Sequence, residues 1–220
     1  EQRSGFNFVV VVPDSYEETI DALCTGLADV AWLATPAYLI VHQKSGAVAE
    51  FSVVRNGSAT HRAQIMVQSA QVREERGLDP ISRLEDLDGK SFAFTNLLST
   101  TGYLFPQAIL IDSGIQFGER LFVGGDAQAV LAVDMGEVDA AASYWAPMRP
   151  DGCPGDARLA LLETYPDVMG VVRILRLSRP IPNDPVVFRC DLRPDIRDRL
   201  IAAFVDLTKS EDGREALEEL

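Results

Sequence analysis

The stretch DLDGKSFAFTNLLSTTGYLFPQAIL, residues 86–110, carries the strongest structural signal in the chain. Its first apolar run predicts a buried strand that follows a turn, and its second apolar run predicts a helix. The helix cannot begin much before Gly102, because Pro106 deep inside it would lack an N–H and would clash with the preceding turn. The hydroxyl side chains between the two runs therefore lie in the connecting loop or in the first helical cap. They belong to Ser99, Thr100 and Thr101.

Hydroxyl groups at the start of a helix suit an anion. The N–H groups of the first turn have no partner inside the helix, and they carry a partial positive charge. Ser and Thr add donors at short range, so such a site needs no Lys or Arg. The alternative is that these residues only cap the helix. A cap needs one hydroxyl, and the stretch has three, so both interpretations stay open at this point.

Strands and helices alternate along the rest of the chain, which predicts an α/β class with largely parallel sheets. The other predicted strands are 6–13, 29–34, 49–54, 63–68, 120–125, 138–145 and 171–177. The predicted helix starts are a capping box of Ser15 with Glu18, a Thr35 cap with Pro36 behind it, an Asp126 cap, and Pro194. Residues 150–166, rich in Pro, Gly and Asp, predict an exposed connection.

One unit occurs twice. ALCTGLADVA at 22–31 and AVDMGEVDAA at 132–141 share the pattern helix, Gly, two residues, Asp, one residue, Ala, strand. A shared preference of αβ turns for Gly would explain part of this match. Ten aligned positions with matching flanks favour two related sheets in one chain. Two such lobes form a cleft, and clefts between domains are common ligand sites.

The composition excludes several classes of protein. The chain has 220 residues and a net charge of −13, so it has no basic surface for nucleic acid or for an anionic membrane. No apolar run is long enough to span a membrane. Cys24, Cys153 and Cys190 have no spacing typical of a metal site, and we expect them to be small buried apolar residues.

The 86–110 stretch resembles the phosphonate-, phosphite- and phosphate-binding proteins of bacterial ABC importers. In that family a DLxGK turn leads to a strand, to Ser-Thr-Ser-Gly-Tyr and to a helix that contains Pro. The stretches 15–40, 123–145 and 179–200 are similar to family segments in the same order. The resemblance implies a type II periplasmic-binding-protein fold whose two lobes close over a ligand. It also implies a first strand and helix ahead of residue 6, which we expect this chain to lack.

The resemblance implies one lobe of residues 1–62 with 172–220 and a second lobe of residues 63–171. It also implies a monomeric periplasmic or membrane-anchored extracellular protein, with an importer permease as partner and no cofactor. Carried over residue by residue, it predicts six ligand-binding residues. These are Tyr16, His61, Ser99, Thr100, Thr101 and Asp126. Tyr103 also matches the motif but is equally explained by packing.

Asp126 departs from the family, because phosphonate binders often have a histidine there. A carboxylate repels a dianion, but it accepts a hydrogen bond from a protonated oxyanion or from an amine. Asp126 therefore favours a monoprotonated oxyanion or a zwitterion, unless it only caps its helix.

The leading hypothesis is a solute-binding protein that captures a small phosphorus oxyanion. An enzyme on the same fold, such as a pyrimidine-precursor synthase or a small-acid lyase, is an alternative that would need a catalytic His or Cys in the cleft. A sensor module for a membrane kinase is a further alternative, since fold resemblance does not separate importer from sensor.

Overall fold

The computed structural model describes the chain except residues 1–4, 56, 148–154, 212 and 215–220. The chain divides into two compact units, residues 1–55 with 184–220, and residues 56–183. The expected division placed 56–62 and 172–183 with the first lobe. In the structure they belong to the second unit, because the strand that begins at Thr60 pairs there with the strands at 172–177 and 181–182.

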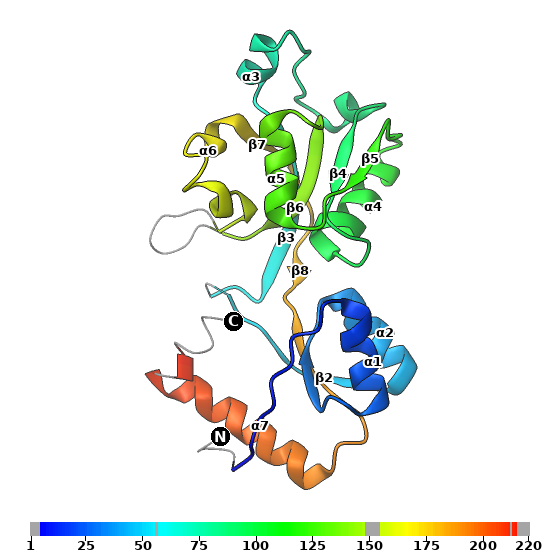
Figure 1. Ribbon diagram of the computed structural model, residues 1–220, viewed down its shortest axis with the longest axis vertical. Coiled ribbons are helices and arrows are strands. Elements are labelled where there is room, and N and C mark those ends of the chain that lie inside the picture. The colour runs from blue at the N-terminus through cyan, green and yellow to red at the C-terminus, as the bar shows by residue number, and fades with distance from the viewer. Residues whose placement is uncertain (1–4, 56, 148–154, 212, 215–220) are drawn as a thin grey trace. The chain divides into compact units, whose positions relative to one another are not determined.

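The first unit is a three-stranded sheet with helices on both faces (Figure 1). Its elements are α1 (Tyr16–Thr25), β1 (Val30–Trp32), α2 (Thr35–Ser45), β2 (Val48–Ser52), β9 (Pro185–Phe188) and α7 (Pro194–Lys209). The central strand β9 pairs antiparallel with β1 and with β2. Val187 packs among α1 and α2, whereas its neighbours Val186 and Phe188 pack with α7. This alternation follows from the two-residue period of a strand.

Two predictions for the start of the first unit differ in outcome. Ser15 caps α1 as predicted, and its Oγ accepts a hydrogen bond from the Glu18 N–H at 3.2 Å. The predicted buried strand at 6–13 is wrong: no strand of the described chain pairs with it, and Val9–Val12 are 73–88% exposed. A β-branched run forms a strand only where a neighbour supplies hydrogen bonds, so the local sequence is not sufficient.

Two smaller predictions for the first unit are also corrected. Thr35 is the first residue of α2 and not its cap, because the N-cap position is Ala34. Cys24 is half-buried, but Cys190 is exposed, and its Sγ donates to the Ser45 carbonyl at 2.8 Å. Cys153 lies outside the described residues.

The second unit is built on one larger sheet in the order β5-β4-β6-β3-β7, with β8 paired to β3. Its strands are β3 (Thr60–Gln68), β4 (Phe92–Phe94), β5 (Arg120–Phe122), β6 (Ala140–Trp145), β7 (Val172–Leu177) and β8 (Ile181–Pro182). Its helices and helical turns are α3 (Ala70–Glu75), η1 (Leu84–Leu87), η2 (Thr100–Leu104), α4 (Phe105–Asp112), α5 (Asp126–Met135), η3 (Ala157–Leu161) and α6 (Val168–Val171). Strand β4 runs parallel to β5 and β6, whereas β3 pairs antiparallel with β6, β7 and β8. The prediction of largely parallel sheets therefore holds only for β5-β4-β6.

Helices cover both faces of this sheet. Met66, Ala93 and Ala141 pack with α5, and the residues on either side of each of them pack with Leu110 of α4. The two helices that follow β4 and β5 therefore lie on opposite faces, which places their N-termini around one end of the parallel strands.

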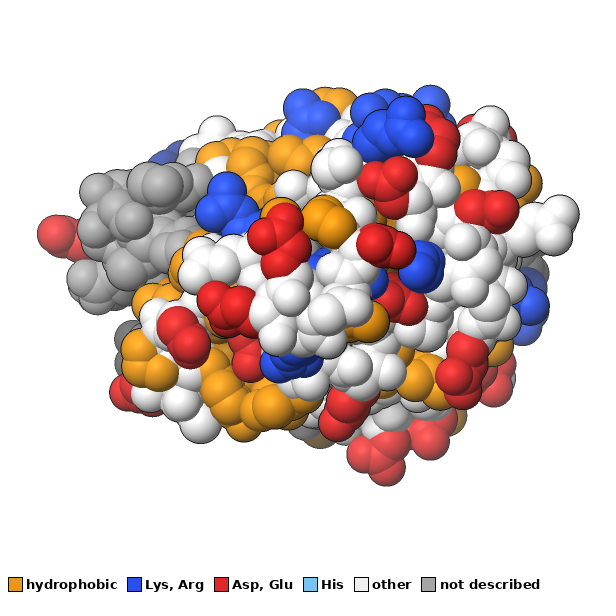
Figure 2. Space-filling view, turned by 90° about the horizontal axis from the view of Figure 1, so that it is seen from above, with side chains coloured by type: hydrophobic (Ala, Val, Ile, Leu, Met, Phe, Trp, Pro, Cys, Tyr) orange, Lys and Arg blue, Asp and Glu red, His pale blue; other side chains and the backbone are white. Residues whose placement is uncertain are grey.

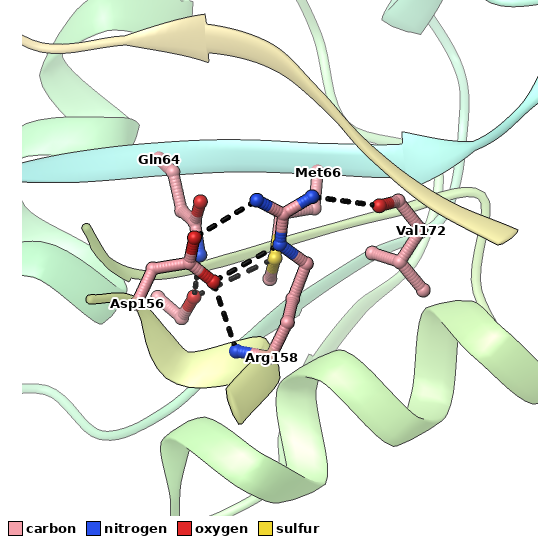
Figure 3. Close-up of polar contacts among 6 residues, drawn as sticks. Gln64, Met66, Asp156, Arg158 and Val172 are labelled. Carbon is pink, nitrogen blue, oxygen red and sulfur yellow. Dashed lines mark hydrogen bonds and ion pairs between the residues drawn. The ribbon is translucent and has the colours of Figure 1, made fainter. Parts of the chain in front are cut away.

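Hydrogen bonds of a buried polar cluster connect η3 to the sheet (Figure 3). The Arg158 guanidinium donates to both carboxylate oxygens of Asp156, at 3.0 and 2.8 Å, and to the Val172 carbonyl of β7 at 3.0 Å. Nearby, Gln64 Nε2 donates to Ser143 Oγ at 2.9 Å. The prediction that 150–166 is an exposed connection is wrong for Asp156–Arg158, which are buried. Their charges are tolerated inside because they are paired and hydrogen-bonded.

The surface agrees with the composition. Figure 2 shows acidic side chains spread over the displayed face with basic ones among them. No helix in the described ranges has the length and apolar character needed to cross a membrane.

Candidate functional site

The hydroxyl-rich turn begins a helix that continues into α4. Ser99 is the N-cap, and its Oγ accepts a hydrogen bond from the Gly102 N–H at 2.9 Å. The first turn, η2, is wide: the Leu104 N–H donates to the Ser99 carbonyl, and the Phe105 N–H donates to the Thr100 carbonyl. These bonds span five residues, which is π-helical geometry. Pro106 follows directly, in the first turn of α4, where its missing N–H is tolerated.

Thr100 and Thr101 do not act as caps. Their residues are only 8% and 7% exposed, and neither hydroxyl forms a hydrogen bond within the described ranges, although neither oxygen is among the fully buried polar atoms that lack a partner. Both hydroxyls can therefore donate to a ligand that reaches this turn. The N–H groups of both residues lie in the first helical turn, where no intrahelical acceptor exists. The turn therefore offers unpaired donors at the positive end of a helix.

Thr95, at the end of β4, is a residue that the sequence analysis did not single out. Its Oγ1 is buried without a hydrogen-bond partner, and its N–H donates to the Gly102 carbonyl at 3.1 Å. A Cβ at Gly102 would lie 2.0 Å from this oxygen, so only glycine fits there. The available signal was a fourth hydroxyl directly after the strand FAF, on the same connection.

The topology gathers most of the predicted site residues at one edge of the second sheet. The carboxyl ends of β4, β5 and β6 lie together because these strands are parallel. The hydroxyl turn follows β4, and Asp126 follows β5. Strand β3 runs the other way, so its first residues reach the same edge, and His61 Nδ1 there lies 2.9 Å from Asn183 Oδ1.

Asp126 occupies a different local position from the predicted one. The N-cap of α5 is Gly125, so the interpretation of Asp126 as a helix cap is wrong. Its Oδ1 instead accepts a hydrogen bond from the Tyr144 N–H at the end of β6, at 3.2 Å. Burial raises the pKa of the Asp126 carboxyl, and the bond from Tyr144 opposes that rise. The carboxylate thus lies in the first turn of α5 and bonds the end of β6, and it does not cap the helix.

Two further motif residues are placed as follows. Tyr16 belongs to the first unit, as the first residue of α1, and is the predicted site residue that lies outside the edge of the second sheet. Tyr103 packs in an aromatic cluster, with its ring centroid 5.1 Å from that of Phe94 and 5.4 Å from that of Phe122. Its packing explains its presence in the motif.

The described residues contain no group of three or more His, Cys, Asp or Glu side chains that could hold a metal ion. The edge thus offers hydroxyl and N–H donors, one carboxylate and one imidazole. Such a set can bind and orient an oxyanion.

Comparisons with known proteins identify the family and the fold. The sequence profile of the family described as the periplasmic phosphonate substrate-binding protein of ABC transporters matches residues 1–220. The phosphate-import protein PhnD of Mycolicibacterium smegmatis is 23% identical over 157 residues, which is 66% of this chain and 47% of that protein. The chain thus spans about half the length of this curated relative.

Two solved structures have a similar fold. The binding protein of an ABC phosphonate transporter from Pseudomonas aeruginosa aligns with a TM-score of 0.74 at 19% identity, covering 97% of this chain and 68% of that one. PhnD1 from Prochlorococcus marinus, solved in complex with methylphosphonate, aligns with a TM-score of 0.70 at 16% identity, covering 95% and 75%. The fold is therefore that of the mixed α/β periplasmic binding proteins. Together with the full-length profile match, this shows that the chain belongs to the family of periplasmic phosphonate-binding proteins of ABC transporters.

Proposed function

We propose that this protein captures a small phosphorus oxyanion, a phosphonate, phosphite or phosphate, and presents it to the permease of an ABC importer. The observation that carries the proposal is the pair Thr100 and Thr101 at the start of a helix, nearly buried residues whose hydroxyls form no hydrogen bond within the described ranges. A family named for phosphonate binding supports the choice of anion. A periplasmic location, and a role in binding and not in catalysis, follow from the same proposal.

In the proposed site the oxyanion accepts hydrogen bonds from the hydroxyls and N–H groups of η2. Each hydrogen bond to a charged group contributes roughly 1.5–3 kcal/mol. The partial positive charge of the helix N-terminus adds to this attraction. His61 contributes a further donor, and we propose Tyr16 as a ligand contact.

Asp126 selects the protonation state of the ligand. A carboxylate beside a dianion is repulsive, but it accepts a hydrogen bond from a P–OH group or from an ammonium group. Its fixed position against the Tyr144 N–H supports this role, because the carboxylate is oriented before any ligand binds.

The direct test is calorimetric titration with phosphate, phosphite, methylphosphonate and aminoethylphosphonate. Thr100→Val should weaken binding about tenfold to a hundredfold, because one charge-assisted hydrogen bond is lost. Ser99→Ala should weaken binding less, since Ser99 Oγ already caps the helix. Thr164→Val, in an exposed connection of the same unit, is the matched control and should bind like the wild type. If Thr100→Val binds with unchanged affinity and has an unchanged melting temperature, the site assignment is wrong.

The protonation role of Asp126 has its own test. If the carboxylate accepts a ligand proton, affinity for methylphosphonate should fall as the pH rises through the ligand's last pKa, because the dianion has no proton to donate. Asp126→Asn should flatten this dependence, since an amide can donate to the dianion. A wild type that binds equally on both sides of that pKa would rule the role out.

A further inference from the structure

The edge of the second sheet also holds a cation that no motif marks. Arg179 follows Ser178, directly beyond β7, and its backbone position is fixed by β3. The Ser178 N–H donates to the Ala63 carbonyl at 2.9 Å, and Ser178 Oγ accepts from the Ala63 N–H at 2.9 Å. Ser178 Oγ also donates to the Arg179 carbonyl at 2.7 Å. The backbone at Arg179 is therefore held in place by β3. The first residues of β3 reach the same edge of the sheet as the hydroxyl turn.

The guanidinium of Arg179 is held over the ring of Phe105, with Cζ 5.6 Å from the ring centroid. Phe105 begins α4, and its N–H donates to the Thr100 carbonyl. The cation thus stacks on the first residue of α4, which directly follows the turn that carries the Thr100 and Thr101 hydroxyls. The same turn packs against β3, the strand that anchors Ser178. Two independent sets of contacts bring Arg179 and the hydroxyl turn together.

Arg179 lacks the carboxylate partner that several other arginines have. The chain has 33 acidic and 20 basic residues, so a carboxylate partner is easy to find. Arg73, Arg158 and Arg197 are each paired with one. The Arg179 guanidinium has no hydrogen bond or ion pair within the described ranges and stacks on the Phe105 ring, as Arg120 stacks on Phe117. Because stacking occupies one face of the guanidinium, its N–H groups stay available at the edge.

We infer that Arg179 is the cation that contacts the bound oxyanion, and that it sets how much negative charge the site accepts. The inference rests on the proposed function. The hydroxyl turn supplies only neutral donors, and Asp126 supplies a negative charge. Arg62 at the start of β3 is also a cation, but its guanidinium already donates to the Ser178 carbonyl, whereas that of Arg179 is unpaired in the part of the chain that the structure describes. With Arg179, the site has a carboxylate on the α5 side and a guanidinium on the α4 side. This polarity fits a ligand whose charged oxygens lie toward η2 and whose proton or amine lies toward Asp126.

The test is calorimetric titration of the full chain with methylphosphonate, phosphite and phosphate. Arg179→Gln should weaken binding by about tenfold or more, as expected for loss of a charged donor. Arg179→Lys should recover part of this loss, because it keeps the charge but loses the planar fork and the stacking. The gap between wild type and Arg179→Gln should narrow between about 20 mM and about 500 mM NaCl, because salt screens an exposed charge. Arg173→Gln, which removes the same charge from the other end of β7, is the matched control and should bind like the wild type.

The outcomes separate this inference from the proposed function. If Thr100→Val loses affinity while Arg179→Gln binds like the wild type at low salt, the inference is overturned and the proposed function stands. If Arg173→Gln weakens binding as much as Arg179→Gln, the effect is one of net charge and the inference is also overturned. If the wild type binds none of the three anions, the proposed function and the inference fall together.

Discussion

The repeated segment, residues 22–31 in the first unit and 132–141 in the second, has the same backbone in two different surroundings. Both helices end at a glycine with φ of 77°, Gly26 and Gly136, and both following strands begin directly after the aspartate. A left-handed residue at this position is the common way to end a helix, and glycine adopts it without strain. The local geometry is thus duplicated in full.

The two aspartates of the repeat have very different partners. Asp139 accepts from Arg73 at 3.0 Å, and from the N–H and Oγ of Ser91 at 3.1 and 2.9 Å. Arg73 is 2% exposed and also donates to the Asp79 carbonyl. Asp29 is 64% exposed and lies 3.1 Å from Arg189 Nε. The comparison teaches that a repeated sequence specifies the turn, whereas burial decides how much its aspartate contributes to stability.

The largest expected effect is at Asp139. Asp139→Ala leaves the Arg73 guanidinium buried without its carboxylate, and breaking such a pair costs about 3–5 kcal/mol of the free energy of unfolding. Urea denaturation followed by circular dichroism measures this loss. A loss below that of Asp29→Ala would contradict the assignment of the buried pair.

Asp139 should also make the free energy of unfolding depend on pH. Burial raises the pKa of Asp139, but the bonds from Ser91 and the charge of Arg73 outweigh it, so the pKa lies below its usual range. The stabilisation is therefore fully present above the unfolded-state pKa of about 3.9, and it is lost as the pH falls through the folded pKa. The difference between wild type and Asp139→Ala should shrink in acid, below about pH 4. A difference that stays constant down to pH 2 would exclude the carboxylate as its source.

The second-largest effect is the loss of stability when Gly26 or Gly136 is replaced by alanine, and it should differ between the two positions. Alanine in the left-handed region costs roughly 1–2 kcal/mol, so Gly26→Ala and Gly136→Ala should both destabilise. At Gly136 the added methyl would also lie 2.0 Å from Arg76 Nη1 and 3.2 Å from Gln68 Nε2, whereas at Gly26 it meets only Arg189 Nη1 at 2.8 Å. Gly136→Ala should therefore have the lower melting temperature of the two. Equal losses would mean that the Arg76 side chain moves aside without cost.

The smallest effect is expected at Asp29. Exposed ion pairs contribute about 0–1 kcal/mol, so Asp29→Ala should change the free energy of unfolding by less than about 1 kcal/mol. High salt should remove most of the difference, because the pair is exposed. A loss of several kcal/mol would show that Asp29 has a role in the first unit beyond its contact with Arg189.

Local signals in the sequence predicted a large part of the fold. The Ser15 cap, the glycine ends of α1 and α5, the strand at 138–145 and the helix that starts at Pro194 are confirmed. Each depends on dihedral preferences or on hydrogen bonds within a few residues. The run at 6–13 failed because a strand depends on a partner that its own residues do not specify. The prediction of an exposed connection at 150–166 failed at Asp156–Arg158, because polar residues there form a buried charge pair; residues 150–154 lie outside the described residues.

For the candidate site, the sequence by itself determined the hydroxyl turn, because Pro106 and the short strand before it leave few places where a helix can begin. It also determined the paired glycine turns of the repeat. Only the tertiary structure decided that Asp126 bonds the Tyr144 N–H and does not cap α5. It likewise decided that Arg179 stands over Phe105, residues 74 positions apart in the chain. The physical reason is that these contacts arise where strand ends meet, and strand pairing depends on long-range burial that no local stretch encodes.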